Sequence, residues 1–360
     1  MKRKFLKSLC ILAIVSLGIT PLMAESNINY MTKELSKDEV DKEENLLTVE
    51  VAIKRAIEGD NTLVKYKREL KSHEDEIEKM NNYSSQKYLS KKIDIAEMNQ
   101  KIEFQKDKIA KNVTDKYQSI ILMEKNLELL KKQNELNENR VKQASLQKSK
   151  GYIDEVTYNK AVTTLENSRI SEVQLQRNLT DIKNGFNNLT SCTVDEYTLY
   201  VPTTYIPFEV ENTINSYAQS KALIMTDFSR QRVELMQDKY WDNFILGPTS
   251  SYDDYINGKA ELDSSMDMIE NTYNNYVLMI ESQYTNLQKQ VDTINTKGKD
   301  IQTILKDQKI LEIRYKNGYI SKMEYDTQKM ALLSKEIEYI SEIYRYNITK
   351  MQIEKPWVMN

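Results

Sequence analysis

KGYIDEVTYN, at Lys150–Asn159, returns about 167 positions later as NGYISKMEYD, at Asn317–Asp326. Gly, Tyr, Ile and the later Tyr keep the same spacing, and each copy lies between two long, charged segments with periodic apolar residues. A glycine between helical runs, followed within a few positions by Asp or Ser, is typical of a helix C-cap and a new N-cap. Two such corners predict two helical hairpins, and therefore a tandem duplication of one elongated helical unit.

The first 24 residues have the pattern of a secretory signal peptide. Four basic residues precede an apolar run of about eleven residues, Leu9–Ile19, and a cleavage site follows at Ala24. That run is too short to span a bilayer as a stable helix. Removing 1–24 takes away four basic and no acidic residues, so the formal net charge falls from −3 to −7. We therefore expect an exported protein without a lipid anchor, located in the extracytoplasmic cell envelope, and no nucleic-acid partner.

The remaining composition favours helices. The whole chain has 8 Gly and 5 Pro in 360 residues, and every proline falls outside the long periodic segments. No later segment has the apolar length of a transmembrane helix, and the single remaining cysteine, Cys192, excludes an intrachain disulfide. These features predict an all-α fold of tandem-duplicated, long antiparallel helical hairpins with coiled-coil character and little or no β-structure.

The order of segments along the chain predicts six regions. They are a signal peptide (1–24), a flexible leader (25–46), a first helical repeat (47–190), a linker with a possible short strand (191–207), a second helical repeat (208–355) and a tail (356–360). The apolar periodicity predicts helices at about 48–80, 91–150, 154–190, 208–243, 259–316 and 321–355.

The predicted helix lengths suggest how each repeat is built. At 1.5 Å per residue, each long helix would extend about 90 Å, and the two shorter helices of a repeat together about 105 Å. Two short helices stacked end to end would then lie alongside one long helix. Such a helix pair is too thin to bury an ordinary core, so we expect its apolar faces to meet between repeats or on neighbouring subunits.

The chain resembles the outer membrane efflux protein family, the TolC-like channel components of export pumps, over about 47–355. The most specific matches are LTVEVAI at Leu47–Ile53, the two glycine corners, and RYKNGYISKMEY at Arg314–Tyr325. The resemblance implies the protomer of a helical tunnel (an α-barrel), formed by a homotrimer. It also implies that the corners meet an adaptor (membrane fusion) protein that is joined to an inner-membrane pump. The residues that it assigns to this docking are Lys150, Gly151, Tyr152, Ile153, Asn317, Gly318, Tyr319 and Ile320.

One feature departs from the family pattern. The family carries membrane strands between the first and second helices of each repeat, where this chain has only about 81–90 and 244–258. Two membrane strands of about 9–11 residues and a turn need more than about 20 residues. We therefore expect the helical tunnel part without the membrane β-hairpins, and an indirect association with the membrane.

The other notable residues have structural explanations. Glycine at the corners ends a helix because it accepts positive φ, and Tyr158 and Tyr325 are expected to pack across the hairpins. His73 is the only histidine, so a metal site is not expected. Cys192 has no basic neighbour that would activate it. Carboxylates such as Glu336 and Glu338 are spaced with lysines as on solvated helix faces. We expect no catalytic activity, no metal and no cofactor.

The leading functional hypothesis is an exported TolC-like channel or conduit component of an efflux or export system, which self-associates and docks through its corners to an adaptor. The alternative is a structural coiled-coil spacer of the cell envelope with no transport role. An adaptor-like fusion protein fits less well, because the β-rich segments typical of that class are missing from the sequence.

Overall fold

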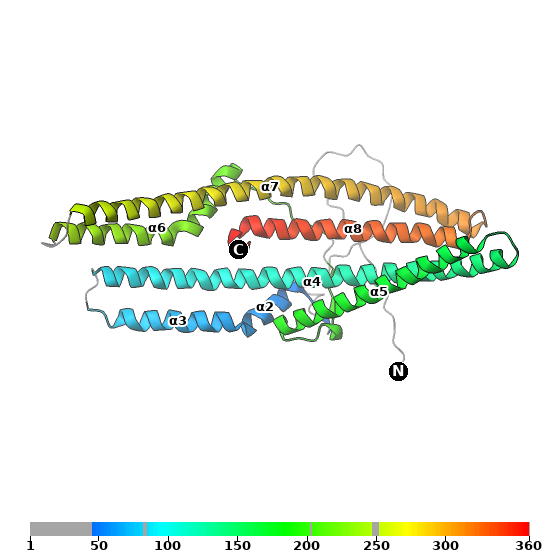
Figure 1. The fold of residues 1–360 in the computed structure, drawn as a ribbon, viewed down its shortest axis with the longest axis horizontal. Coiled ribbons are helices and arrows are strands. Elements are labelled where there is room, and N and C mark those ends of the chain that lie inside the picture. The colour runs from blue at the N-terminus through cyan, green and yellow to red at the C-terminus, as the bar shows by residue number, and fades with distance from the viewer. Residues whose placement is uncertain (1–44, 82–84, 202–203, 247–251, 360) are drawn as a thin grey trace. The chain divides into compact units, whose positions relative to one another are not determined.

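The computed structural model describes residues 45–81, 85–201, 204–246 and 252–359. These residues are almost entirely helical, which confirms the predicted all-α fold (Figure 1). The predicted signal peptide and most of the predicted leader lie outside the described residues. In chain order the elements are β1 (Leu46–Leu47), α2 (Val49–Gly59), α3 (Asn61–Glu78), α4 (Gln86–Ser149), α5 (Glu155–Thr190), the 3-10 helix η1 (Val194–Glu196), β2 (Thr198–Leu199), α6 (Ile214–Leu246), α7 (Tyr252–Lys316), α8 (Lys322–Glu354) and the 3-10 helix η2 (Pro356–Val358).

The two long helices follow the predicted apolar seams. Helix α4 is 64 residues long and α7 is 65 residues long, and each starts several residues earlier than the periodicity predicts. The early start of α4 has a local cause, since the Tyr88 backbone N–H donates to Ser85 Oγ at 3.2 Å and so caps the helix. The periodic apolar residues that are buried include Met98, Ile102, Ile109, Val113, Ile120 and Leu127 in α4, and Ile269, Ile280, Leu287, Ile294 and Ile301 in α7.

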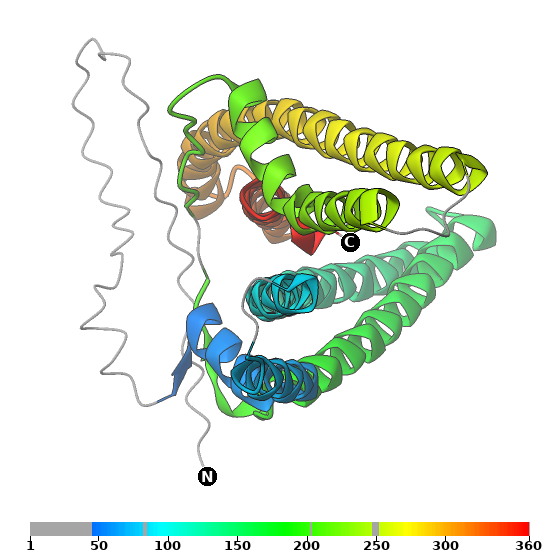
Figure 2. The ribbon, with the colours of Figure 1, turned by 90° about the vertical axis from the view of Figure 1, so that its left-hand side faces the viewer.

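The chain divides into two compact units, and each unit draws on both predicted repeats. Unit 1 contains the described parts of 1–52, 113–206 and 289–347, and unit 2 those of 53–112, 207–288 and 348–360. In unit 1, α5 lies beside the later part of α4, and α8 beside the later part of α7 (Figures 1 and 2). In unit 2, α3 lies beside the earlier part of α4, and α6 beside the earlier part of α7 (Figures 1 and 2). Both glycine corners therefore belong to unit 1.

A short sheet in unit 1 joins two segments that are distant in sequence. Leu46 and Leu47 of β1 pair in parallel with Thr198 and Leu199 of β2. The hydroxyl of buried Tyr117 on α4 lies 2.6 Å from the Leu47 carbonyl oxygen and 2.8 Å from that of Tyr200. Leu46, which we assign to the flexible leader, is therefore a strand residue. The predicted linker is held against α4 at the same place.

The helix predicted at 48–80 is interrupted, and this part of the prediction is wrong. Helix α2 ends at Gly59, and the Asp60 side chain caps α3 by accepting a hydrogen bond from the Leu63 backbone N–H at 2.7 Å. Gly59 and Asp60 together carry the same glycine-then-cap signal that predicts the two corners. The break after Gly59 is therefore a local feature of the sequence.

Helix α6 begins at Ile214, later than the start predicted near 208. Phe208 instead packs edge-on against Tyr217 and Tyr284, with ring centroids 5.6 and 6.1 Å apart. These packing contacts hold 207–213 in a non-helical conformation within unit 2. Among the helices described, none is both long enough and apolar enough to cross a bilayer.

Residues 356–358 of the predicted tail pack on α4 in unit 2. The Trp357 ring stacks on Phe104 with centroids 4.3 Å apart, and its Nε1–H donates to Asp107 Oδ2 at 2.8 Å. Lys355 Nζ donates to the other oxygen of Asp107 at 2.7 Å. A single carboxylate thus accepts two hydrogen bonds from the C-terminal segment, which ties that segment to the long helix.

Candidate functional site

The first corner is closed by backbone hydrogen bonds that require a left-handed residue. Gly151 has φ +75°, and its N–H donates to the Lys148 carbonyl at 2.9 Å. The Tyr152 N–H donates to the Gln147 carbonyl, also at 2.9 Å. This pair of bonds is the Schellman motif, which satisfies carbonyls at the end of α4. A Cβ at Gly151 would meet no atom within 4 Å, so the backbone dihedral angle rather than space calls for glycine.

The second corner repeats this backbone geometry. Gly318 has φ +74°, and its N–H donates to the Tyr315 carbonyl at 3.0 Å. The Tyr319 N–H donates to the Arg314 carbonyl at 2.8 Å. A Cβ would again meet no atom within 4 Å. The predicted role of glycine as the residue that ends the first helix of each hairpin is therefore confirmed by the dihedral angles and the hydrogen bonds.

A side-chain cap starts the return helix at each corner. Asp154 accepts a hydrogen bond from the Thr157 backbone N–H at 2.8 Å, and Ser321 Oγ accepts one from the Glu324 N–H at 3.1 Å. The hydrogen bonds that Asp154 receives from Thr157 lower the pKa of its carboxyl group. The two corners thus differ in one respect here, because the cap of α5 can titrate and the cap of α8 cannot.

Side chains close the first corner by charge. Lys148 on α4 forms an ion pair with Glu155 on α5, with the nitrogen and oxygen 2.9 Å apart. The same ammonium group lies 4.9 Å from the centre of the Tyr158 ring. Tyr158, which we expect to pack across the hairpin, is therefore in contact with a cation from the opposite helix.

Side chains close the second corner by aromatic stacking. The rings of Tyr315 on α7 and Tyr325 on α8 are nearly parallel, at 5°, with centroids 4.8 Å apart. Lys329 lies 5.2 Å from the centre of the Tyr325 ring on the side of α8. Lys316 pairs with Glu312 along α7 at 2.9 Å, which lowers the pKa of Glu312. Tyr158 and Tyr325, the later tyrosines of the two signature copies, thus each face the partner helix of their own hairpin.

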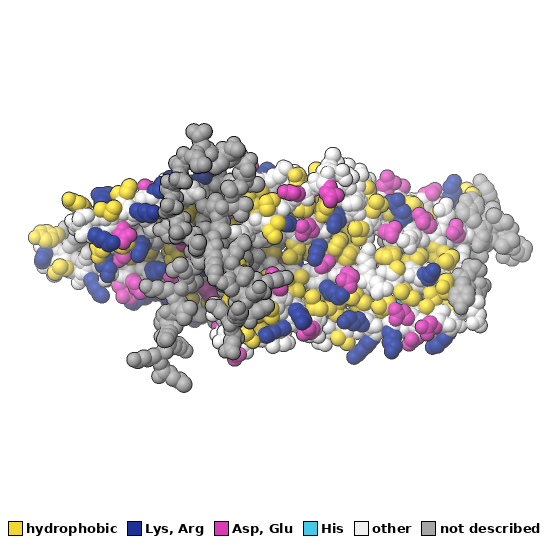
Figure 3. All heavy atoms as spheres, turned by 180° about the vertical axis from the view of Figure 1, so that it is seen from behind, with side chains coloured by type: hydrophobic (Ala, Val, Ile, Leu, Met, Phe, Trp, Pro, Cys, Tyr) yellow, Lys and Arg dark blue, Asp and Glu magenta, His cyan; other side chains and the backbone are white. Residues whose placement is uncertain are grey.

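The eight residues that the resemblance assigns to docking differ in accessibility. Tyr152 and Tyr319 are strongly exposed, at 76% and 77%. Ile153 is half-buried and Ile320 is buried, so these two are the least available to a partner. Apolar side chains reach the surface at the α4–α5 corner of unit 1 (Figure 3). The remaining four residues, all exposed, are Lys150, Gly151, Asn317 and Gly318.

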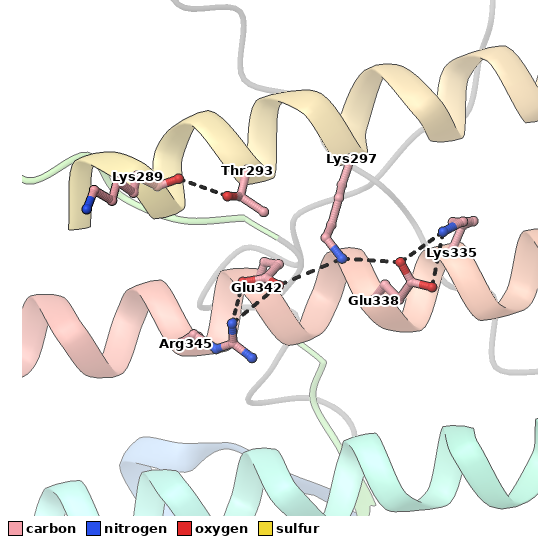
Figure 4. Close-up of polar contacts among 7 residues, drawn as sticks. All are labelled: Lys289, Thr293, Lys297, Lys335, Glu338, Glu342 and Arg345. Carbon is pink, nitrogen blue, oxygen red and sulfur yellow. Dashed lines mark hydrogen bonds and ion pairs between the residues drawn. The ribbon is translucent and has the colours of Figure 1, made fainter. Parts of the chain in front are cut away.

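The second hairpin is held together behind its corner by a network of charges (Figure 4). Lys297 on α7 bonds to Glu338 on α8 at 3.2 Å and lies 3.7 Å from Glu342. Lys335 and Arg345 pair with the same two carboxylates along α8. Hydrogen bonds from Lys335 and Lys297, together with their charges, lower the pKa of Glu338. The sequence reveals the pairs within α8 by their spacing, but it contains no signal for the partner on α7.

Glu336 departs from the prediction of a solvated helix face. It is half-buried in a groove between α8 and α4, and burial raises the pKa of its carboxyl group against the lowering effect of Lys125 and Lys132. The helix spacing that places Glu336 near Lys335 in sequence cannot reveal that α4 covers this side of α8. The prediction fails because the burial is tertiary.

The isolated histidine and cysteine lie outside the corners. His73 Nδ1 is 3.0 Å from Lys91 Nζ, between α3 and α4 in unit 2. Cys192 is a buried free cysteine whose sulfur lies 2.9 Å from Thr190 Oγ1. Within the part of the chain that the structure describes, no three side chains of the metal-binding types gather at one place.

Comparison with known proteins by sequence finds no matching family model and no matching curated protein. Solved structures do match. The outer membrane protein VceC of Vibrio cholerae aligns with a TM-score of 0.57 and 10% identity over 85% of this chain and 95% of VceC. The CmeC outer membrane channel of Campylobacter jejuni aligns with a TM-score of 0.58 and 10% identity over 96% of this chain and 94% of CmeC. The outer-membrane channel OprN aligns with a TM-score of 0.56 and 10% identity over 86% of this chain and 90% of OprN.

This chain has the TolC-like fold of outer membrane efflux channels. The likeness extends over nearly the full length of the chains compared, so it concerns the whole arrangement of helices rather than one hairpin. At 10% identity the match is one of fold. In the TolC-like fold of this chain, both glycine corners have the same backbone geometry, and among the residues that the structure describes they carry the most exposed tyrosines.

Proposed function

We propose that this chain is a non-enzymatic subunit of a TolC-like conduit in an efflux or export system of the cell envelope. The observation that supports this most strongly is the match of fold to outer membrane channels over nearly the whole of both chains. Exported copies of the chain assemble, as a trimer, around a central opening. The glycine corners of each copy dock to an adaptor protein that connects the conduit to a pump.

Two structural features support assembly from several copies of the chain. Each hairpin is only two helices thick, and several large apolar side chains on α5 and α7 stay exposed in the single chain, among them Ile170, Val173 and Leu278. Single exposed apolar side chains are ordinary, but long helices that keep several of them call for neighbouring subunits. Neighbouring copies of the same chain can cover these exposed apolar side chains without a second kind of subunit.

The assembly is tested with the purified chain beginning after residue 24. Chemical cross-linking and mass photometry over a range of concentrations should give a trimer. Negative-stain electron microscopy of the cross-linked species should give end-on views with a central opening. A chain that stays monomeric at every concentration contradicts the proposal, and so does an oligomer with a filled centre, which would be a spacer.

A further inference from the structure

The two corners present apolar side chains at the same three positions relative to glycine: five residues before it, one after it and five after it. Gly151 and Gly318 have nearly the same φ and the same hydrogen bonds around them. Side chains at equivalent positions therefore project from the two turns in similar directions. We call these two sets the corner triads. They are Leu146, Tyr152 and Val156 in the first corner, and Ile313, Tyr319 and Met323 in the second.

The corner triads are exposed where apolar side chains are usually covered. Besides the two tyrosines, Leu146, Val156 and Ile313 are 57%, 59% and 60% exposed, and Met323 is half-buried. The Schellman turn brings the residue after glycine close to the last turn of the preceding helix, so each tyrosine lies next to the first member of its triad. Exposed apolar side chains gathered at one place mark a contact surface, whereas scattered ones do not.

Charge around each triad is balanced, and part of it is paired within the chain. Within eight positions of either glycine the basic and acidic residues are equal in number. In the first corner, Asp154 caps α5 and Glu155 is paired with Lys148. In the second corner, Glu312 is paired with Lys316. Neutral surroundings do not attract an anionic lipid surface or a nucleic acid, which both need a basic excess. An apolar protein surface has no such requirement.

Size argues that the two triads act together. An aromatic side chain can bury about 150–250 Å², while a specific interface of ordinary size buries about 800 Å² on each partner. One triad therefore provides too little area for stable binding. Two triads on the same chain reinforce each other, because binding at one corner raises the effective concentration of the partner at the other.

We propose that the corner triads are two equivalent half-sites for apolar recesses on a protein partner, and that this binding depends little on salt. The inference rests on the proposed function, since the partner is the adaptor, and it specifies the chemistry of the adaptor's docking surface. Tyr152 and Tyr319 are the central contacts, because tyrosine contributes a large rigid area and is common among the residues that dominate interfaces.

The partner is identified by photo-cross-linking in cells that produce the chain. A photoreactive phenylalanine derivative replaces Tyr152 in one variant and Tyr319 in another. The control variant carries it in place of Ile206, which is 75% exposed and lies far from either corner in sequence. We expect both corner variants to trap the same protein, and the control not to trap it. Different proteins at the two corners, lipid adducts alone, or no adduct at either corner would overturn the proposal.

Binding chemistry is measured with the trapped partner, purified, and the full exported chain by biolayer interferometry at about 50 and about 500 mM NaCl. The dissociation constant should change less than about threefold between these conditions, because no charge is exchanged. Tyr152→Ser and Tyr319→Ser should each weaken binding at least about tenfold. Lys142→Ala, which removes an exposed charge on α4 outside the docking residues, should change binding less than about twofold. A salt effect above about tenfold, or a larger effect of Lys142→Ala than of the tyrosine variants, overturns the proposal.

Two further readouts keep the outcomes separate. The tyrosine variants should melt within about 2 °C of the parent chain, since both side chains are exposed, so lost binding is not lost folding. They should also form the same oligomer. A correct oligomer with a central opening whose corners trap no common partner would remove only this inference. A strictly monomeric chain that still binds through both corners would remove only the conduit.

Discussion

The two corners of unit 1 have the same backbone conformation, but different side chains join the two helices at each corner. Gly151 and Gly318 have φ values of +75° and +74°, with the same two backbone hydrogen bonds at each turn. Across the first corner a lysine pairs with a glutamate, while across the second a tyrosine stacks on a tyrosine. The shared part depends on a dihedral angle that only glycine adopts cheaply, so it persists. The side-chain pairs across the hairpins need only to fill the same space. They therefore differ between the two corners.

The largest effect is expected where the shared backbone is broken. Gly151→Val and Gly318→Val should each lower the free energy of unfolding by about 2 kcal/mol, because a β-branched residue is strained at positive φ. Urea unfolding followed by circular dichroism measures both variants. The matched control is Gly298→Ala within α7, where the new Cβ would lie 3.5 Å from Tyr339 Cε2, an ordinary contact, and stability should not fall. Unequal losses at the two corners would show that they are not equivalent.

The caps come next, and pH separates them. Ser321→Ala should cost about 1 kcal/mol at every pH, because a hydroxyl cap does not titrate. Asp154 has a lowered pKa in the folded chain, so its contribution is present above the unfolded pKa of about 3.9 and is lost as pH falls through the folded value. Asp154→Ala should therefore be destabilising at neutral pH and progressively less so in acid.

The control for this pair is Asp154→Asn, which keeps a capping oxygen but does not titrate. Thermal unfolding of the three variants from neutral to acidic pH gives the comparison. If the Asp154→Ala difference does not shrink as the pH falls, the ionised carboxylate is not what holds the start of α5.

The cross-hairpin pairs should respond differently to salt. Tyr315→Leu removes the stack on Tyr325 and should cost about 0.5–1.5 kcal/mol with little salt dependence. Lys148→Met removes the pair with Glu155. Because the side chains of Lys148 and Glu155 are 35% and 70% exposed, the loss should stay below about 0.5 kcal/mol and shrink in high salt. Double-mutant cycles with Tyr325→Leu and Glu155→Gln isolate each pair. A salt-dependent second corner would contradict the contrast drawn between the two.

The smallest effect concerns the residue just before each glycine. Asn317 Nδ2 donates to the Ile313 carbonyl at 2.8 Å, a bond that Lys150 does not make at the equivalent position. Asn317→Lys should therefore destabilise the second corner by about 0.5 kcal/mol or less. Lys150→Asn should stabilise the first corner by a similar amount. Chemical denaturation of both variants in parallel provides the measurement, and changes of the same sign would rule out this small difference between the corners.

Much of the candidate site could be predicted because it is local. The glycine, the cap after it and the tyrosine seven residues beyond it act within about two helical turns, so their spacing carries the information. The contacts of the tyrosines could not be read in the same way. Lys148 and Tyr315 occupy the same position before glycine, yet one faces its tyrosine partner as a cation and the other as an aromatic ring.

The fold shows the same division between local and distant signals. Periodic apolar residues predict the long helices, and the local signal of Gly59 followed by a capping Asp60 accounts for the break between α2 and α3. No spacing within 25–46 could show that Leu46 pairs with Thr198, because only a partner about 150 residues away makes it a strand. Likewise, Glu336 lies among charges in sequence, and only the neighbouring helix α4 makes it half-buried.

By itself, the sequence determined two helical hairpins, each turned at a glycine and restarted by a capping side chain. These features follow from dihedral preferences and hydrogen bonds between residues a few positions apart. The tertiary structure alone decided how Tyr117 ties β1 and the Tyr200 segment to α4, and how Trp357 packs on Phe104. Those contacts join segments distant in sequence, and their free energy comes from burial and hydrogen bonding that exist only once the chain has folded.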